Sequence, residues 1–189
     1  ADGSAPSAPA NLQGTAVSTS RIDLAWTAST DNVGVIGYRI YRNAAVIGTA
    51  TGTSFSDTGL SEYTTYTYRV AAYDAEGNES SQSTPLSATT VDATPPSVPS
   101  NLQGAASSTS RIDLTWSAST DNAGVTGYRV YRNGSLVASP AGTSYSDTGL
   151  AEATSYSYTV AAYDDEGNTS APCGAVAVYT ADATAPSIP

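Results

Sequence analysis

The chain has 189 residues, with 17 acidic side chains against seven cationic ones that are all arginine, so its formal net charge is −10. Such an acidic surface repels phosphate groups, which disfavours nucleic acid and anionic membranes as partners. The absence of histidine removes the usual general base and the commonest transition-metal ligand, and the single cysteine, Cys173, excludes a disulfide within the chain.

The sequence repeats itself at a fixed spacing of 90 residues without insertion or deletion. Trp26 recurs as Trp116, and Tyr38 recurs as Tyr128. A fixed period of this length predicts a tandem array of similar domains. We expect a first domain over residues 6–92, a proline-rich linker over 93–98, a second domain over 99–182, and the start of a further linker or repeat over 183–189. The chain is then a segment of a longer protein.

The first predicted strands of each copy have one apolar face. An opening strand is expected near Leu12, and in the next strand Ile22, Leu24 and Trp26 alternate with small or polar residues. Period-two alternation places these three large side chains on one side of a strand. The second copy repeats the pattern with Leu102, Ile112, Leu114 and Trp116.

A hairpin follows in each copy. Tyr38 and Ile40 alternate with Arg39 and Tyr41, which indicates a strand with its apolar side chains on one face. In the second copy this strand ends at Asn133-Gly134, a strong signal for a two-residue type I′ turn. The return strand is expected at Val46-Ile47 and Leu136-Val137, and a further short strand at Phe55 and Tyr145.

The longest predicted strand runs from Tyr66 to Tyr73 and ends at the acidic turn 74–78, where Gly77 can supply a positive φ. A last strand is expected at 86–90 and again at 175–180. About seven short strands per copy, with no apolar helical periodicity, predict an all-β chain of two tandem seven-stranded antiparallel β-sandwiches with immunoglobulin-like architecture. Helix should be nearly absent, and Cys173 should be a small buried or half-buried apolar side chain.

As a set, these residues resemble a fibronectin type III domain. The resemblance rests on Pro9-Ala10-Asn11-Leu12, on Leu24-x-Trp26, on the Tyr-Arg-Ile-Tyr-Arg strand and on Leu60-x-x-x-Thr64-x-Tyr66. It implies that Tyr66 and Tyr156 are tyrosine corners whose hydroxyls bond to the backbone near Leu60 and Leu150. Glu62 and Glu152 stand where the family often has proline.

A narrower resemblance is to the fibronectin type III modules of secreted bacterial enzymes that degrade polysaccharides, such as chitinases and cellulases. It rests on Ala-Ser-Thr-Asp-Asn-x-Gly-Val, on Ala-Tyr-Asp-x-Glu-Gly-Asn and on the Thr-Pro-Pro-Ser-Val-Pro linker. It implies modules that sit between catalytic and carbohydrate-binding domains in an extracellular protein. The prolines of the linker favour an extended, stiff connection.

Two kinds of binding residue are candidates. Exposed tyrosines on adjacent strands could stack on sugar rings, although cross-strand packing alone also explains them; these are Tyr41, Tyr73, Tyr131 and Tyr163. Loop carboxylates at one end of each sandwich could bind Ca²⁺, although acidic residues are also common turn formers. The calcium candidates are Asp31, Asp74, Glu76 and Glu79, and in the second copy Asp121, Asp164, Asp165 and Glu166.

The sequence favours a non-catalytic, semi-rigid spacer in a larger extracellular bacterial protein. Glycoside hydrolysis needs two carboxylates across a sugar cleft, and the loops are too short to build one. Two alternatives remain: a weak carbohydrate-binding module that uses the tyrosine pairs, and a stalk segment of a cell-surface adhesin. We expect a monomer without cofactors, whose partners are the flanking domains of its own chain. For the carbohydrate-binding alternative, a polysaccharide is a further partner.

Overall fold

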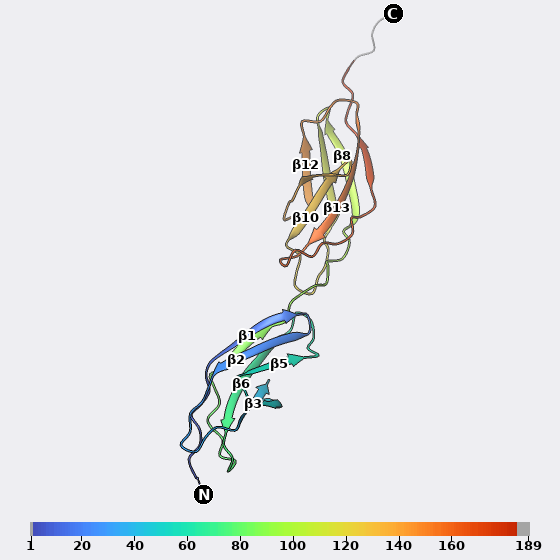
Figure 1. The fold of residues 1–189 in the computed structure, drawn as a ribbon. Coiled ribbons are helices and arrows are strands. Elements are labelled where there is room, and N and C mark those ends of the chain that lie inside the picture. Colours follow the sequence, from blue (N-terminus) through green and yellow to red (C-terminus); the bar gives the residue numbers. More distant parts are fainter. Residues whose placement is uncertain (1, 185–189) are drawn as a thin grey trace, which may run out of the picture. The chain divides into compact units, whose positions relative to one another are not determined.

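The computed structural model (Figure 1) describes residues 2–184 and divides into two compact units, Ala1–Asp92 and Ala93–Pro189. We call these units domain 1 and domain 2 and describe each by itself. The predicted start of a further linker or repeat lies outside the described residues from position 185 onward. Residues 2–184 contain no helix, and therefore none that could cross a membrane.

Domain 1 is a sandwich of two antiparallel sheets. A three-stranded sheet has the order β1-β2-β5, and a four-stranded sheet has the order β4-β3-β6-β7. The strands are β1 (Ala10–Ser18), β2 (Arg21–Thr27), β3 (Gly37–Arg42), β4 (Ala45–Ala50), β5 (Ser54–Thr58), β6 (Thr65–Tyr73) and β7 (Leu86–Thr89).

Domain 2 repeats this topology, with sheets of order β12-β9-β8 and β11-β10-β13-β14. The all-β, seven-stranded architecture predicted for each copy is thus confirmed. The strands are β8 (Ser100–Ser108), β9 (Arg111–Ser117), β10 (Gly127–Arg132), β11 (Ser135–Ala138), β12 (Ser144–Thr148), β13 (Ser155–Tyr163) and β14 (Val176–Tyr179).

The core of domain 1 lies between its two sheets and is built from alternate residues of the strands. Trp26 on β2 meets Tyr38 on β3 edge to face, with ring centroids 5.3 Å apart. This geometry suits the opposite charges of a ring's edge and face. The other fully buried residues of this core cluster alternate as the sequence predicts, while Ala71 is buried outside it; the cluster includes Ile22, Leu24, Ile40, Tyr68, Val70 and Ala72. Burying a side chain of this size contributes about 1.5–3 kcal/mol.

A buried ion pair joins the two sheets of each domain. Asp57 on β5 is 5% exposed, and both of its carboxylate oxygens accept hydrogen bonds at 2.9 Å from Nη1 of Arg42 on β3. The hydroxyl of Tyr68 on β6 donates to the same carboxylate at 2.8 Å. Domain 2 repeats the contacts with Asp147, Arg132 and Tyr158. Loss of one partner would leave a buried charge uncompensated, which typically costs about 3–5 kcal/mol.

The last turn before β6 is fixed by a tyrosine hydroxyl. The Tyr66 oxygen accepts a hydrogen bond from the amide of Ser61 at 3.0 Å, next to Leu60. Tyr156 does the same for Ala151 at 2.9 Å. Both contacts have the geometry of a tyrosine corner. Glutamate at position 62 or 152 is therefore compatible with this turn.

The single cysteine is buried and takes part in the fold. Cys173 is 9% exposed, and its Sγ accepts a hydrogen bond from the amide of Val160 at 3.3 Å. In domain 1 the hydroxyl oxygen of Ser83 accepts the equivalent bond from Val70 at 3.1 Å. The two side chains therefore serve the same backbone group in the two copies.

The hairpin between the third and fourth strands differs between the domains in one residue. Asn133 and Gly134 have φ of 50° and 81°, as a type I′ turn requires. In domain 1 the same positions are Asn43 and Ala44, with φ of 49° and 69°. Alanine in this left-handed region is strained because its Cβ approaches the following carbonyl oxygen.

We therefore expect Ala44→Gly to stabilise domain 1 by about 1 kcal/mol, and Gly134→Ala to destabilise domain 2 by a similar amount. Native-state hydrogen exchange of the intact chain measures the stability of each domain separately, from the exchange rates of the amides of β6 and β13. A faster exchange of β6 in Ala44→Gly would contradict the strain argument.

The two buried tyrosines, Tyr68 and Tyr158, should make both domains less stable at alkaline pH. Burial, and then the hydrogen bond to Asp57, raise the pKa of Tyr68, and the same causes act on Tyr158 through Asp147. A tyrosine has a pKa of about 10 in the unfolded chain. Because the pKa is higher in the folded state, the protonated tyrosine stabilises the fold below about pH 10, and this stabilisation is lost as the pH rises above that value. Urea midpoints measured from about pH 8 to about pH 11 should fall steeply above pH 10.

The control for this prediction is the pair Tyr68→Phe and Tyr158→Phe, which removes both buried hydroxyls. The double variant should be less stable at neutral pH, because each aspartate loses a donor, and its stability should fall less between pH 10 and 11. An equally steep fall in the double variant would assign alkaline unfolding to other groups.

Candidate functional site

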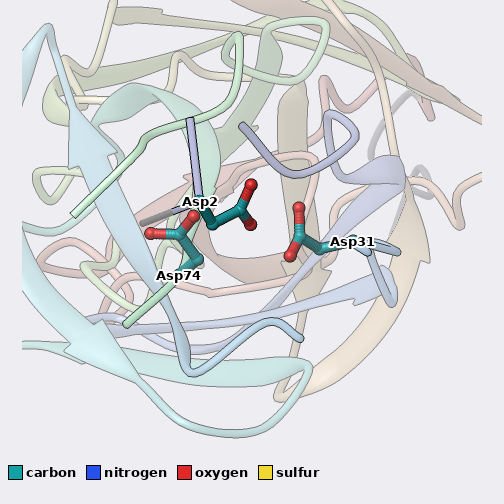
Figure 2. Close-up of side chains that lie close together, drawn as sticks. All are labelled: Asp2, Asp31 and Asp74. Carbon is teal, nitrogen blue, oxygen red and sulfur yellow. The ribbon is translucent and has the colours of Figure 1, made fainter. Parts of the chain in front are cut away.

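Three carboxylates from distant parts of domain 1 meet at one end of the sandwich. Asp2 precedes β1, Asp31 lies in the loop after β2, and Asp74 directly follows β6. Each offers a carboxylate oxygen, and these oxygens all lie within 4.8 Å of one another. Figure 2 shows the three side chains converging from three separate segments.

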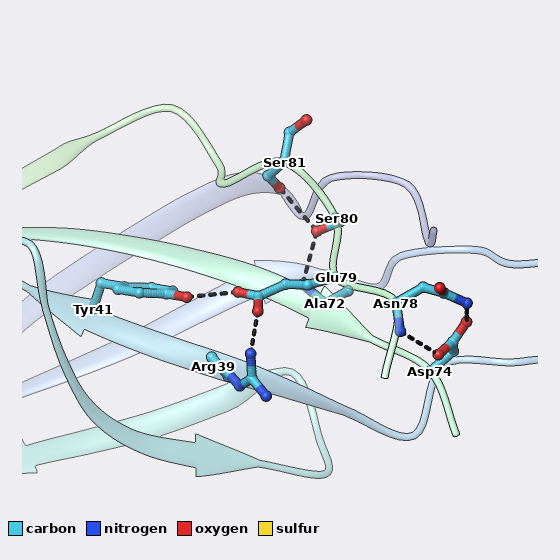
Figure 3. A network of polar contacts seen from close by, with 8 residues as sticks. All are labelled: Arg39, Tyr41, Ala72, Asp74, Asn78, Glu79, Ser80 and Ser81. Carbon is cyan, nitrogen blue, oxygen red and sulfur yellow. Dashed lines mark hydrogen bonds and ion pairs between the residues drawn. The ribbon is translucent and has the colours of Figure 1, made fainter. Parts of the chain in front are cut away.

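Local hydrogen bonds hold Asp31 and Asp74 in place. One oxygen of Asp31 accepts from the amides of Val33 and Gly34, both at 2.9 Å, and these bonds lower the pKa of its carboxyl group. Asp74 is 1% exposed, and its two oxygens accept from the backbone and side-chain nitrogens of Asn78 at 2.8 and 2.7 Å (Figure 3). Both turns hold their carboxylates in a fixed orientation.

Asn78 also connects the loop to the segment before β1. Its side-chain nitrogen donates to the backbone carbonyl of Asp2 at 3.1 Å. One carboxylate oxygen of Asp2 accepts from the amide of Ser4 at 3.0 Å, and the other, Oδ2, is buried without a hydrogen-bond partner among the described residues.

Domain 2 brings together the two equivalent loop residues. A carboxylate oxygen of Asp121 lies within 4.8 Å of a carboxylate oxygen of Asp164. Asp121 Oδ1 accepts from the amides of Ala123 and Gly124 at 2.8 and 3.0 Å, while its Oδ2 is buried and has no hydrogen-bond partner within residues 2–184. Asp164 is held by Asn168, as Asp74 is by Asn78.

Four of the calcium candidates from the sequence come together in pairs, one pair in each domain. Asp31 and Asp74 come together, and so do Asp121 and Asp164. Glu76, Asp165 and Glu166 are exposed and belong to neither group. Sequence reasoning missed Asp2, although aspartate recurs at positions 2, 92 and 182, one ahead of each copy.

The remaining calcium candidate, Glu79, lies on the face of the four-stranded sheet. It accepts a hydrogen bond from Arg39 and one from the hydroxyl of Tyr41, the latter at 2.5 Å (Figure 3). The bond to Glu79 raises the pKa of Tyr41. One of the two proposed sugar-stacking tyrosines of domain 1 is therefore tied to a neighbouring carboxylate.

The other tyrosine of the pair, Tyr73, is covered by a cation. The Arg39 guanidinium carbon lies 5.3 Å from the centroid of its ring. The register pairs Tyr73 with Gly37 and Tyr41 with Arg69, so the two tyrosines are four positions apart along the sheet, or about 13 Å. They form two separate aromatic positions with Arg39 between them.

Domain 2 lacks the acid on this face. Thr169 replaces Glu79, and Arg129 donates to its hydroxyl oxygen at 2.8 Å while lying 5.1 Å from the Tyr163 ring centroid. Tyr131 lines a hollow of about 300 Å³ with Gly134, Thr159, Thr169, Ser170 and Pro172. This hollow combines an aromatic ring with several hydroxyl groups.

Comparison with known proteins agrees with this architecture. Exoglucanase B of Cellulomonas fimi is 46% identical over 200 aligned residues, which cover 100% of this chain but 18% of that protein. Chitinase A1 of Niallia circulans is 45% identical, with 97% of this chain and 27% of that protein covered. For exoglucanase A of C. fimi the identity is 48%, with 97% and 22% covered.

The chain therefore spans about a fifth to a quarter of these relatives. A model of the fibronectin type III domain matches residues 7–89 and 97–175, one match in each sandwich. With the sheet order, the buried tryptophans and the tyrosine corners in place, the chain belongs to the fibronectin type III family as a tandem pair of domains.

Proposed function

We propose that this chain is a non-catalytic pair of spacer domains in a larger extracellular bacterial protein that degrades polysaccharides. The observation that carries the proposal is the alignment: nearly the whole chain matches a minor part of two exoglucanases and a chitinase. Most of each relative lies outside the match. The flanking domains of the same protein are then the partners of this pair.

The buried acids support a role without catalysis. The carboxylate of Asp57 is bonded to Arg42 and Tyr68, and that of Asp147 to Arg132 and Tyr158. A glycosidase needs two free carboxylates that face a sugar from positions about 5–9 Å apart. These two are engaged in joining the sheets instead.

The connection between the domains supports a spacer with restricted freedom. The amide of Val91 still bonds to Ser18 in domain 1, at 3.2 Å, and the amide of Ser97 already bonds to Thr120 in domain 2, at 2.9 Å. Residues 92–96 alone connect these anchors, and the six residue steps from Val91 to Ser97 span about 19 Å along an extended proline-rich path. Pro95 and Pro96 fix their own φ and also restrict the residue before each.

The stiff connection predicts the effect of replacing Pro95 and Pro96 with glycine. Spin labels at one exposed β-strand position in each domain should give a narrow distance distribution in the wild-type chain and a markedly broader one in the double variant. Glycine restores the φ freedom that proline removes. Equally broad distributions would show that the linker is already a free tether.

One observation favours carbohydrate binding as a second candidate function, and it concerns domain 2 alone. Tyr131 and its counterpart Tyr41 each border a hollow, but Thr159, Thr169 and Ser170 line that of Tyr131, whereas the hydroxyl of Tyr41 is bonded to Glu79. Aromatic faces with nearby hydroxyl groups suit sugar rings. No comparable observation favours the adhesin stalk.

This second candidate predicts different effects for two equivalent substitutions. Tyr131→Ala should lower retention of the chain on insoluble cellulose or chitin several-fold, and Tyr41→Ala should leave it unchanged. Pull-down at several protein concentrations measures both. If the wild-type chain is not retained at all, or if both variants lose retention equally, carbohydrate binding at the hollow is wrong.

A further inference from the structure

The carboxylate group at the end of domain 1 has the geometry of a cation site. Oxygens of Asp2, Asp31 and Asp74 lie within 4.8 Å of one another. Two ligand oxygens at about 2.4 Å from the same Ca²⁺ ion can be separated by at most ~4.8 Å. The three oxygens therefore meet the pairwise distance that binding to one shared Ca²⁺ ion requires.

No ion pair among the described residues balances the charges of this group. None of the ion pairs formed within residues 2–184 includes Asp2, Asp31 or Asp74; the arginines engaged are Arg21, Arg39, Arg42, Arg111 and Arg132. Asp74 is almost completely buried, so solvent screens its charge little. Three negative charges at this separation repel one another unless a cation lies between them.

A second observation points to a ligand at the same place. Oδ2 of Asp2 is buried and accepts no hydrogen bond from the described residues. In Figure 2 the Asp2 carboxylate lies between the side chains of Asp31 and Asp74. A buried carboxylate oxygen without a donor is unfavourable. In domain 2, Oδ2 of Asp121 is likewise buried and lacks a hydrogen-bond partner beside Asp164.

The chemistry of the donors selects the type of cation. All three side chains offer hard carboxylate oxygens, and domain 1 contains neither histidine nor cysteine, which zinc and copper sites favour. The three oxygens come from irregular segments of the chain. Ca²⁺ tolerates such variable geometry, whereas Mg²⁺ demands a near-ideal octahedron and retains its waters.

We propose that Asp2, Asp31 and Asp74 form a Ca²⁺ site that fastens the segment before β1 to the two loops at that end of domain 1. The ion supplies the positive charge that the three carboxylates share, and it gives the buried Asp2 oxygen a partner. Asn78 supports the site, since it holds Asp74 and the Asp2 backbone together. This proposal does not depend on the spacer role.

The test is a Ca²⁺ titration of the intact, isotope-labelled chain after treatment with EDTA, followed by NMR. The amides of Val33, Gly34 and Asn78 donate to Asp31 or Asp74, so they report on domain 1 alone. We expect their signals to shift with a midpoint of about 10⁻⁴–10⁻³ M, the range of extracellular calcium modules. Mg²⁺ should require a clearly higher concentration.

The variant Asp2→Asn keeps the shape of the side chain and lies before the first strand, so its amide spectrum should show an intact fold. It should raise the Ca²⁺ midpoint about tenfold or more, because it removes one ligand charge. The matched control is Glu76→Gln, which removes the same charge from an exposed neighbour outside the group and should leave the midpoint unchanged.

Three results would overturn the proposal. The first is no shift of the three amides up to about 10 mM Ca²⁺, well above the weakest extracellular sites. The second is an equal change of midpoint in Asp2→Asn and Glu76→Gln, which would indicate general attraction to an acidic surface. The third is an equal midpoint for Mg²⁺, which would contradict the assignment to Ca²⁺.

Discussion

Each sandwich depends on one buried carboxylate that links its two sheets. Asp57 extends from β5 of the smaller sheet to Arg42 and Tyr68 of the larger one. The apolar core alone would allow the sheets to slide over each other, because apolar contact has no preferred direction. A buried ion pair has a direction and loses its compensation if either partner shifts. The contact therefore fixes how the sheets face each other, and Asp147 repeats it in domain 2.

The buried carboxylates of Asp57 and Asp147 are therefore used to stabilise the fold, and only side chains at the ends and on the faces of the sandwiches are accessible to ligands. The acids that remain outside the core lie mainly in short loops, where backbone amides orient them. On the larger sheets, Arg39 lies over the ring of Tyr73, and Arg129 lies over that of Tyr163. A module of this kind keeps its shape and presents few free reactive groups. Such properties suit a part that holds other domains at a distance.

The sequence predicted the strands and the core because alternation and turn residues are local signals. Trp26, Ile40 and Tyr68 lie where their period places them, and Asn133-Gly134 forms the expected turn. Contacts between distant segments were harder to foresee. Nothing local to Asp2 indicated that it meets Asp31 and Asp74, and nothing local to Glu79 indicated that it bonds Tyr41 and Arg39. Such contacts depend on how loops close in three dimensions.

The central claim, that the pair acts by holding its neighbours apart, is tested most directly by a fusion experiment. The chain is placed between a cellulase catalytic domain and a cellulose-binding module, and compared with a direct fusion and with a glycine-serine linker of equal length. We predict that the three fusions hydrolyse a soluble substrate at equal rates, and that the fusion with the chain is fastest on insoluble cellulose. Equal rates on insoluble cellulose, or sugar release by the chain alone, would contradict the account.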